Sequence, residues 1–271
     1  MKIDRKNLIL SVVLIIICLS GCGKDNKEND LLQESSKKFL EVSSVRAEVG
    51  VDVLLESFAE TSGISLDMKL ENTSDPLRGH AEALTVLERD EAYVSGEMEV
   101  YQITEDGITT SYSSLNDIWT VETAQYDNEH TSFKPEYIDP NGKNEKFKLS
   151  DESVTYNNEE CYELTGKMSG SEVQKLFDVN TLSLVSDVAI PDEESISKLK
   201  VPVVIDIYRE SMLPAKIFID MTDVLNDIYK DMDEEVSVSK FTIKLEYYDF
   251  NNVEPIEVPE EVIGNAVKTV E

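Results

Sequence analysis

The sequence is poor in the residues on which most active-site chemistry depends. Its 271 residues contain two histidines, one tryptophan and three cysteines. No nucleophile–base pairing involves His80 or His130, and no two carboxylates have the spacing of a general acid and base. We therefore predict that the protein is not an enzyme, and we expect no cofactor.

Basic residues are also scarce. The chain has 25 Lys and Arg against 55 Asp and Glu, which gives a formal net charge of −30. A nucleic-acid partner would require a basic patch to contact phosphates, and the sequence offers none, so we expect no nucleic-acid binding. We interpret the acidity as a solvated surface that keeps a secreted protein soluble.

Divalent cation binding is the alternative interpretation of the acidity. It requires acidic ligands that converge at fixed spacing. Neither Asp192-Glu193-Glu194 nor the cluster at 231–235 has the spacing of a calcium loop, and we interpret both as plain loops. The sequence therefore predicts no metal site.

The sequence also lacks an apolar run long enough to span a membrane. The run from Leu8 to Leu19 has twelve residues, whereas a spanning helix needs about 20. It follows a basic start and leads into Leu19-Ser20-Gly21-Cys22, an order typical of a bacterial lipoprotein signal with a lipobox. We predict a signal peptide at 1–21 and diacylglycerol on Cys22, which would anchor the protein on the extracytoplasmic face of the cell membrane. The alternatives are an ordinary cleaved signal peptide and an uncleaved short anchor.

This interpretation leaves one usable thiol. Cys18 would depart with the signal peptide and Cys22 would carry the lipid, so that no internal disulfide can form. Cys161 lies at the start of an expected strand without a histidine or cationic neighbour, and we predict a small buried hydrophobe, not a nucleophile.

The mature chain opens with a polar stretch. Gly23 to Asp30 contains no apolar residue, and we expect residues 22–30 to comprise the lipidated cysteine and a flexible tether. The following segment, Leu31 to Val42, predicts a helix with Leu32, Phe39 and Leu40 on one side.

Most of the remaining chain alternates apolar and polar residues with a period of two, which is typical of half-buried strands. The connections are too short for crossover helices, so we predict an antiparallel meander. The expected strands lie at 45–55, 64–70, 77–87, 92–103, 107–113, 117–123, 153–168, 201–209, 213–219 and 241–248.

Two short helices interrupt this series. Ser169-Gly-Ser-Glu172 has the form of a capping box before Val173, Leu176 and Phe177, and Asp223 to Lys230 has Val224, Leu225 and Ile228 on its apolar side. We interpret 125–150 as a surface excursion and the two-proline segment 255–262 as the end of the same unit. No linker is evident, and we predict a single β-rich domain over 31–271.

At this point the pattern resembles the LolA/LppX-type group of bacterial lipoproteins. The lipobox, tether, helix and strand series follow the group's order. The residues that carry the resemblance are Cys161-Tyr-Glu-Leu-Thr-Gly166, Ser169-Gly-Ser-Glu172, Leu213-Pro-Ala-Lys216, Tyr247-Tyr-Asp-Phe-Asn251, Ile256 and Pro259.

The resemblance implies an α+β fold in which a curved, unclosed antiparallel sheet, a half-barrel, is partly covered by short helices around an apolar cavity. Several members of the group carry lipids or lipoproteins across an extracytoplasmic space. A fully packed core would produce the same alternation of residues, so cavity and core both remain open. The candidate cavity-lining residues are Val49, Val51, Val53, Leu55, Ile64, Leu66, Met68, Leu70, Ile205, Ile217, Phe241 and Ile243.

Two functional hypotheses follow. In the first, a membrane-anchored extracytoplasmic lipoprotein binds a lipid or another hydrophobic molecule in a cavity between sheet and helices. In the second, a cell-envelope interaction or sensor module with a filled core carries nothing. Permanent lipidation departs from the behaviour of a shuttle, which must leave the membrane, and the fold alone licenses neither hypothesis. Trp119 is expected to be half-buried packing.

Overall fold

The computed structural model of the chain describes residues 27–57, 61–90, 92–125, 147–176, 193–231 and 236–268. The predicted signal peptide, Cys22 and the first part of the tether lie outside these residues. So does most of the predicted surface excursion. Among the helices in the described ranges, none has the length and apolar character needed to cross a membrane.

Thirteen strands form the described sheet. The first group is β1 (Ser44–Ser57), β2 (Thr61–Ser74), β3 (Leu77–Arg89), β4 (Ala92–Glu105), β5 (Ile108–Leu115) and β6 (Ile118–Gln125). The second group is β7 (Lys148–Leu149), β8 (Val154–Tyr156), β9 (Glu159–Ser169), β10 (Lys200–Tyr208), β11 (Pro214–Asp220), β12 (Val236–Tyr248) and β13 (Val267–Lys268).

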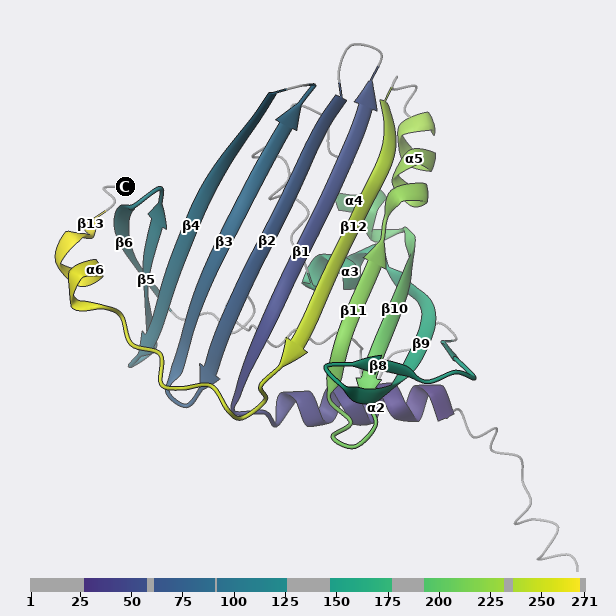
Figure 1. Cartoon of the computed structure of the whole chain (residues 1–271), viewed down its shortest axis with the longest axis horizontal. Coiled ribbons are helices and arrows are strands. Elements are labelled where there is room, and N and C mark those ends of the chain that lie inside the picture. Colours follow the sequence, from purple (N-terminus) through teal and green to yellow (C-terminus); the bar gives the residue numbers. More distant parts are fainter. Residues whose placement is uncertain are drawn as a thin grey trace, which may run out of the picture.

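The sheet is one curved, unclosed layer (Figure 1). Its order is β13-β6-β5-β4-β3-β2-β1-β12-β11-β10-β9-β7, with β8 attached to β9. Consecutive strands pair within β1–β6 and within β9–β12, as the meander prediction requires. The last long strand, β12, pairs antiparallel with the first strand, β1. In this pairing Val51 of β1 lies opposite Ile243 of β12. The predicted fold class, a curved, unclosed antiparallel sheet with short helices, is confirmed.

In the part of the chain that the structure describes, three hairpins turn through two residues that both have positive φ. These pairs are Asp106-Gly107, Asn116-Asp117 and Asn157-Asn158. Positive φ at both central positions is the type I′ geometry that Asn, Asp and Gly tolerate best, and its twist matches the flanking strands. The predicted strand at 153–168 is therefore wrong in one respect: the Asn157-Asn158 turn divides it into β8 and β9.

Within the described residues, five short helices accompany the sheet: α2 (Lys27–Leu40), α3 (Gly170–Leu176), α4 (Glu193–Ser197), α5 (Thr222–Asp231) and α6 (Glu260–Asn265). Helix α2 includes Lys27 to Asp30, a stretch that the sequence predicts as part of the tether. Its packing face holds Leu32 and Phe39, both buried, but Leu40 is 48% exposed, contrary to expectation. Residues 32 and 40 are eight apart, which places them about 80° apart around a helix.

The capping box at the start of α3 is confirmed. The Ser169 hydroxyl accepts the Glu172 N–H at 3.3 Å, and the Glu172 carboxylate accepts the Ser169 N–H at 2.6 Å. Glycine is required at position 170, because a Cβ there would collide with the Ile196 carbonyl of α4. Glu193 and Glu194 begin α4, so the loop predicted for that acidic cluster is wrong for these two residues.

Side-chain hydrogen bonds join helix α5 to β12. The Asn226 amide donates to the Val238 carbonyl and accepts the Val238 N–H, both at 2.7 Å. Leu225 is buried, and Val224 and Ile228 pack against the core, as the sequence predicts.

We call the face on which α2 packs the inner face and the opposite one the outer face. Phe39 of α2 contacts Tyr247 of β12 with ring centroids 5.0 Å apart, and α3 and α4 lie on the same side of the sheet (Figure 1). The core fills the space between these helices and the strands from β1 through β12 to β9. Its fully buried members include Ile205, Ile207, Leu164, Ile217, Ile219 and Ile243.

After β12 the chain crosses the ends of β1 to β4 and reaches the far edge of the sheet (Figure 1). The Asn251 side chain accepts the Ser43 N–H at 2.7 Å, and Arg78 donates to the Ile256 carbonyl at 2.8 Å. Helix α6 then leads into β13, which pairs in parallel with β6. Neither α6 nor β13 is predicted from the residue pattern of this segment.

Candidate functional site

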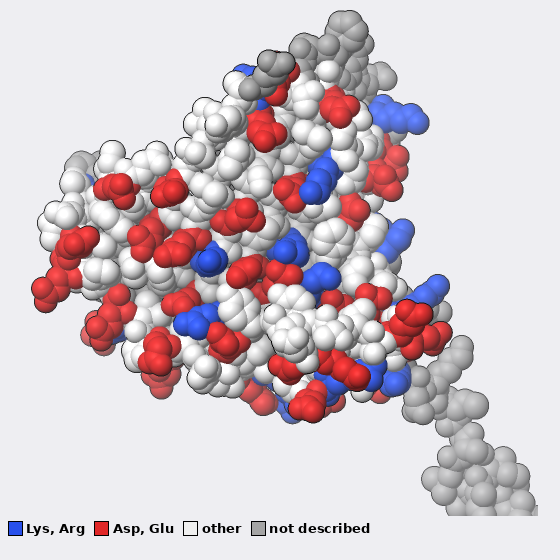
Figure 2. Space-filling view, in the orientation of Figure 1, with Lys and Arg blue, Asp and Glu red and all other residues white. Residues whose placement is uncertain are grey.

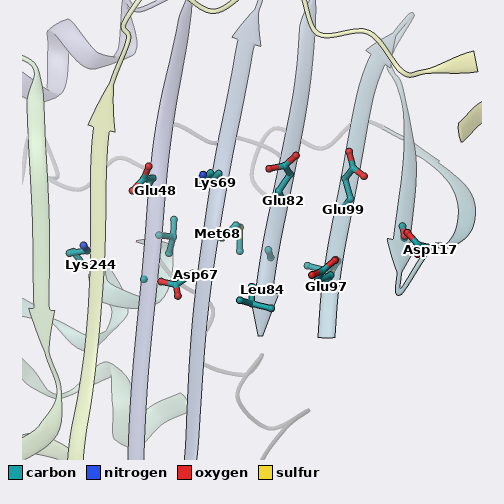
Figure 3. Close-up of a pocket in the computed structure, with 15 residues that line it drawn as sticks. Glu48, Asp67, Met68, Lys69, Glu82, Leu84, Glu97, Glu99, Asp117 and Lys244 are labelled. Atoms are coloured by element: carbon teal, nitrogen blue, oxygen red, sulfur yellow. The ribbon is translucent and has the colours of Figure 1, made fainter. Parts of the chain in front are cut away.

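An open groove of about 600 Å³ runs across β1 to β5 on the outer face (Figure 3). The register of the strands places one row of groove residues side by side across the sheet. From β1 to β5 this row is Glu48, Lys69, Glu82, Glu99 and Ser114. The lining consists of Glu48, Val49, Gly50, Asp67, Met68, Lys69, Glu82, Ala83, Leu84, Glu97, Met98, Glu99, Ser114, Asp117 and Lys244.

The groove is strongly acidic. Its basic side chains are Lys69 and Lys244, against the acidic set Glu48, Asp67, Glu82, Glu97, Glu99 and Asp117. Figure 2 shows the same excess over the rest of the outer face, with basic side chains interspersed near its centre. Such a surface repels anionic ligands and concentrates cations.

Beside the groove, a histidine lies close to two of the carboxylates that line it. Ligand atoms of His80, Glu82 and Glu99 all lie within 4.8 Å of one another. The His80 Nε2 atom is 3.0 Å from Glu99 Oε1, and the Tyr101 hydroxyl donates to the same oxygen at 2.8 Å. Burial, followed by the hydrogen bond to Glu99, raises the pKa of Tyr101, which keeps its hydroxyl protonated and donating.

Sequence reasoning missed this cluster. His80 and Glu82 share a face of β3 because they are two residues apart. The tight turn at Asp90 sets β4 in the register that places Glu99 opposite Glu82 and Tyr101 opposite His80. Both strands are predicted from their alternation of apolar and polar residues. Pairing them in this register is the step that would have revealed the cluster from the sequence.

Beside the cluster, aromatic residues pack beneath the C-terminal segment. Tyr101, Ile256 and Val262 form a small buried cluster on which Tyr112 and Trp119 pack. Trp119 is partly buried there, which confirms it as packing. The C-terminal segment therefore rests on the same tyrosine that contacts Glu99.

The inner face has a separate, mostly apolar hollow. It measures about 280 Å³ and lies at the end of β1 to β4 that is distant from α2. Its apolar centre is one row across four strands, in which Val53 pairs with Ile64, Ile64 with Leu87, and Leu87 with Val94. The complete lining is Val53, Leu55, Ser62, Gly63, Ile64, Leu87, Glu88, Arg89, Ala92, Tyr93 and Val94.

Large apolar side chains stay exposed at this hollow, which Val94 lines, and on the strands next to it. Val94 is 68% exposed, Leu115 60% and Ile118 70%. Leu115 lies opposite Met98 on β4 and Ile118 on β6, and its Cδ1 atom is the nearest neighbour of the position that a Cβ of Gly96 would occupy. At this end of β4 to β6, the inner face thus presents an apolar surface made by Val94, Met98, Leu115 and Ile118.

The predicted cavity-lining residues all fall on the inner face, in two groups. Val53, Leu55 and Ile64 line the hollow. The others lie in the core or pack against it: Ile205, Ile217 and Ile243 have no exposed surface, Val49, Val51 and Phe241 are buried, and Leu66, Met68 and Leu70 are partly buried.

Two buried titratable groups lie farther along the outer face. Asp206 is 3% exposed, with one oxygen 3.3 Å from Lys216 Nζ and the other without a hydrogen-bond partner. Burial raises the pKa of the Asp206 carboxyl, and Lys216 opposes that rise. Cys161 is fully buried, as predicted, and burial raises the pKa of its thiol to about 11.

Comparison with known proteins places the chain in a family. Residues 27–267 match the model described as "Family of unknown function (DUF6612)". The chain belongs to the DUF6612 family. No curated protein matches the sequence.

Two solved structures are similar to this DUF6612 chain. The crystal structure of LprF from Mycobacterium bovis is 11% identical, with a TM-score of 0.45, and the match covers 86% of this chain and 96% of that chain. A DUF1329 family protein from Desulfovibrio piger is 9% identical, with a TM-score of 0.21, over 83% of this chain and 91% of that one. The fold class rests on the described sheet itself, which has the architecture that the resemblance to the LolA/LppX group implies.

Proposed function

We propose that this DUF6612 protein is a lipid-anchored extracytoplasmic protein that binds a lipid or another hydrophobic molecule on the inner face of its sheet. The observation that carries the proposal is the exposed apolar surface of Val94, Leu115 and Ile118 beside an apolar hollow. Contiguous exposed apolar surface of this kind marks sites that bind ligands, proteins or membranes.

The ligand would lie along the inner face of β1 to β6. Val53, Leu55, Ile64 and Leu87 would hold its deepest part, since they line the hollow. Leu66 and Met68, which are partly buried on neighbouring strands, would support it. Ile205, Ile217, Phe241 and Ile243 would underlie the site as packed core.

The first experiment is lipid extraction and mass spectrometry of protein expressed from residue 23 onward. We expect a co-purifying lipid, and displacement of a fluorescent fatty-acid analogue by lipids of the same class. Leu115→Gln should weaken binding of the analogue about tenfold, because one leucine side chain contributes roughly 1.5 kcal/mol or more when buried.

Leu84→Gln is the matched control. Leu84 is also an exposed leucine, but it lies on the outer face, so binding should stay within about twofold of the wild type. Persistently empty protein, together with no effect of Leu115→Gln, would contradict the proposal. It would leave the second function, a cell-envelope interaction module whose filled core between β9 and β12 carries no ligand.

The anchor is tested separately on the full-length chain. Wild-type protein should incorporate labelled palmitate and sediment with membranes, because diacylglycerol on Cys22 supplies two acyl chains. Cys22→Ala should incorporate none and leave the membrane fraction. Labelling that survives Cys22→Ala would overturn lipidation at this cysteine.

A further inference from the structure

We infer that His80, Glu82 and Glu99 form a binding site for a divalent transition-metal ion of the zinc class. The site lies on the outer face of the sheet, opposite the proposed hydrophobic site, and does not depend on it. Three observations support the assignment: the separation of the ligand atoms, the contacts that hold the ligands in place, and the charge of the pair Glu82 and Glu99.

The ligand atoms already have the spacing of a metal site. Zinc binds imidazole nitrogen and carboxylate oxygen at about 2.0 to 2.2 Å, so ligands of a tetrahedral site stand about 3.4 Å apart. His80 Nε2 and Glu99 Oε1 are 3.0 Å apart, and a Glu82 oxygen completes a set within 4.8 Å. Small rotations of exposed Glu82 would bring all three to one ion.

Neighbouring side chains orient two of the three ligands. The other imidazole nitrogen, His80 Nδ1, is 4.0 Å from Glu71, whose carboxylate accepts the Arg46 Nε–H at 2.6 Å. Tyr101 donates to Glu99 at 2.8 Å and stacks on the His80 ring. A hydrogen bond to a carboxylate ligand is an outer contact that metal sites commonly have. Glu71 places a carboxylate near the other imidazole nitrogen, at a separation too long for a hydrogen bond.

The charge arrangement favours a cation at this point. Glu82 and Glu99 are cross-strand partners, and like charges directly opposite each other destabilise a sheet. A divalent ion between them would neutralise this repulsion. Both glutamates line the open groove, so an ion can reach them from solvent.

The ligand set also selects the metal. Calcium and magnesium prefer oxygen ligands alone, whereas one imidazole with two carboxylates suits zinc and its neighbours in the first transition series. Three protein ligands leave a fourth position for water.

The test is calorimetric titration of the full chain, in nonionic detergent at 0.15 M NaCl, with zinc chloride. The salt screens diffuse attraction to the acidic surface. We expect one zinc per chain with a micromolar dissociation constant that 1 mM calcium does not displace. His80→Ala should weaken binding at least twentyfold and Glu82→Gln about tenfold.

Two matched controls separate the site from its surroundings. Glu97→Gln removes a carboxylate of the same groove on the same strand as Glu99, and His130→Ala removes the other histidine of the chain; both should bind zinc within twofold of the wild type. His80→Phe retains an aromatic ring beside Tyr101 but has no nitrogen, and should bind as weakly as His80→Ala. If His80→Ala disturbs folding, the zinc affinity of Glu82→Gln decides whether the site exists, because the Glu82 side chain is exposed. Binding without a one-to-one stoichiometry, or unchanged in His80→Phe and Glu82→Gln, would overturn the inference.

Discussion

The imidazole of His80 stacks on the ring of Tyr101, with centroids 4.3 Å apart and an interplanar angle of 15°. The same tyrosine is buried beneath Ile256 and Val262 of the C-terminal segment. Glu99 of the acidic groove and the packed end of the chain therefore contact the same side chain. Substitutions of Tyr101 should therefore affect both the groove and the packing of the C-terminal segment.

Tyr101→Phe isolates the polar part of this connection. The ring and its packing remain, but Glu99 loses the hydrogen bond that orients it, so we expect zinc affinity to fall about tenfold, as for other outer contacts of metal ligands. Titration calorimetry and the visible spectrum of the cobalt-loaded protein measure the change. Tyr112→Phe, on the neighbouring strand, is the control and should leave both unchanged. Wild-type affinity in Tyr101→Phe would show that the hydroxyl does not position Glu99.

Asp206→Asn should alter how stability depends on pH. Burial raises the pKa of Asp206 in the folded protein, so the folded state binds its proton more tightly than the unfolded state. The stability linked to this proton is present below the ordinary carboxyl pKa and is lost as pH rises through the folded value. The wild type should therefore gain stability relative to the variant as pH falls from 7 toward 4, and the variant should be at least as stable at pH 7.

Urea unfolding at several pH values measures this difference. Asp52→Asn is a matched control, because Asp52 also pairs with a lysine, Lys240 at 2.8 Å, but both side chains are about half exposed. It should change stability by less than about 1 kcal/mol at each pH. A wild type that loses stability relative to Asp206→Asn on acidification would mean that the Lys216 pair outweighs the burial of the carboxyl.

Ile217→Ala tests the packed half of the inner face. Ile217 has no exposed surface, and truncating a core isoleucine to alanine typically costs about 2 to 5 kcal/mol. Urea unfolding followed by Trp119 fluorescence reports the change. Ile263→Ala, at an exposed position of α6, should stay within about 0.5 kcal/mol. A cost near zero for Ile217 would indicate an unfilled cavity beside it.

Cys161 should be unreactive in the folded protein. Its thiol is buried, and with its pKa raised to about 11 almost no thiolate is present at pH 7. A chain expressed from residue 23 carries this cysteine alone, so a chromogenic disulfide reagent should react with one thiol in urea and none in buffer. Rapid reaction in buffer would mean that β9 opens locally under native conditions.

The sequence predicted what local chemistry determines. Alternation places the strands because one face of each is buried, and Ser169 and Glu172 specify a helix start through their own hydrogen bonds. What it missed depends on pairing between distant segments. No feature of the sequence near either strand indicates that β12 pairs with β1. The apolar character of Leu40 likewise does not indicate which side of α2 packs against Tyr247. The His80 cluster was missed for the same reason, since it exists only once β3 and β4 are in register.

The strands that stand last at the two ends of the described sheet are each two residues long. At one end stands β13 and at the other β7, while the strands between them include several of thirteen or fourteen residues. A long exposed edge strand can pair with a strand of another chain, whereas very short or charged edge strands disfavour such pairing. Lys268 on β13 and Lys148 on β7 place a positive charge on each margin. An open half-barrel can thus keep an accessible inner face without becoming a template on which copies of itself polymerise.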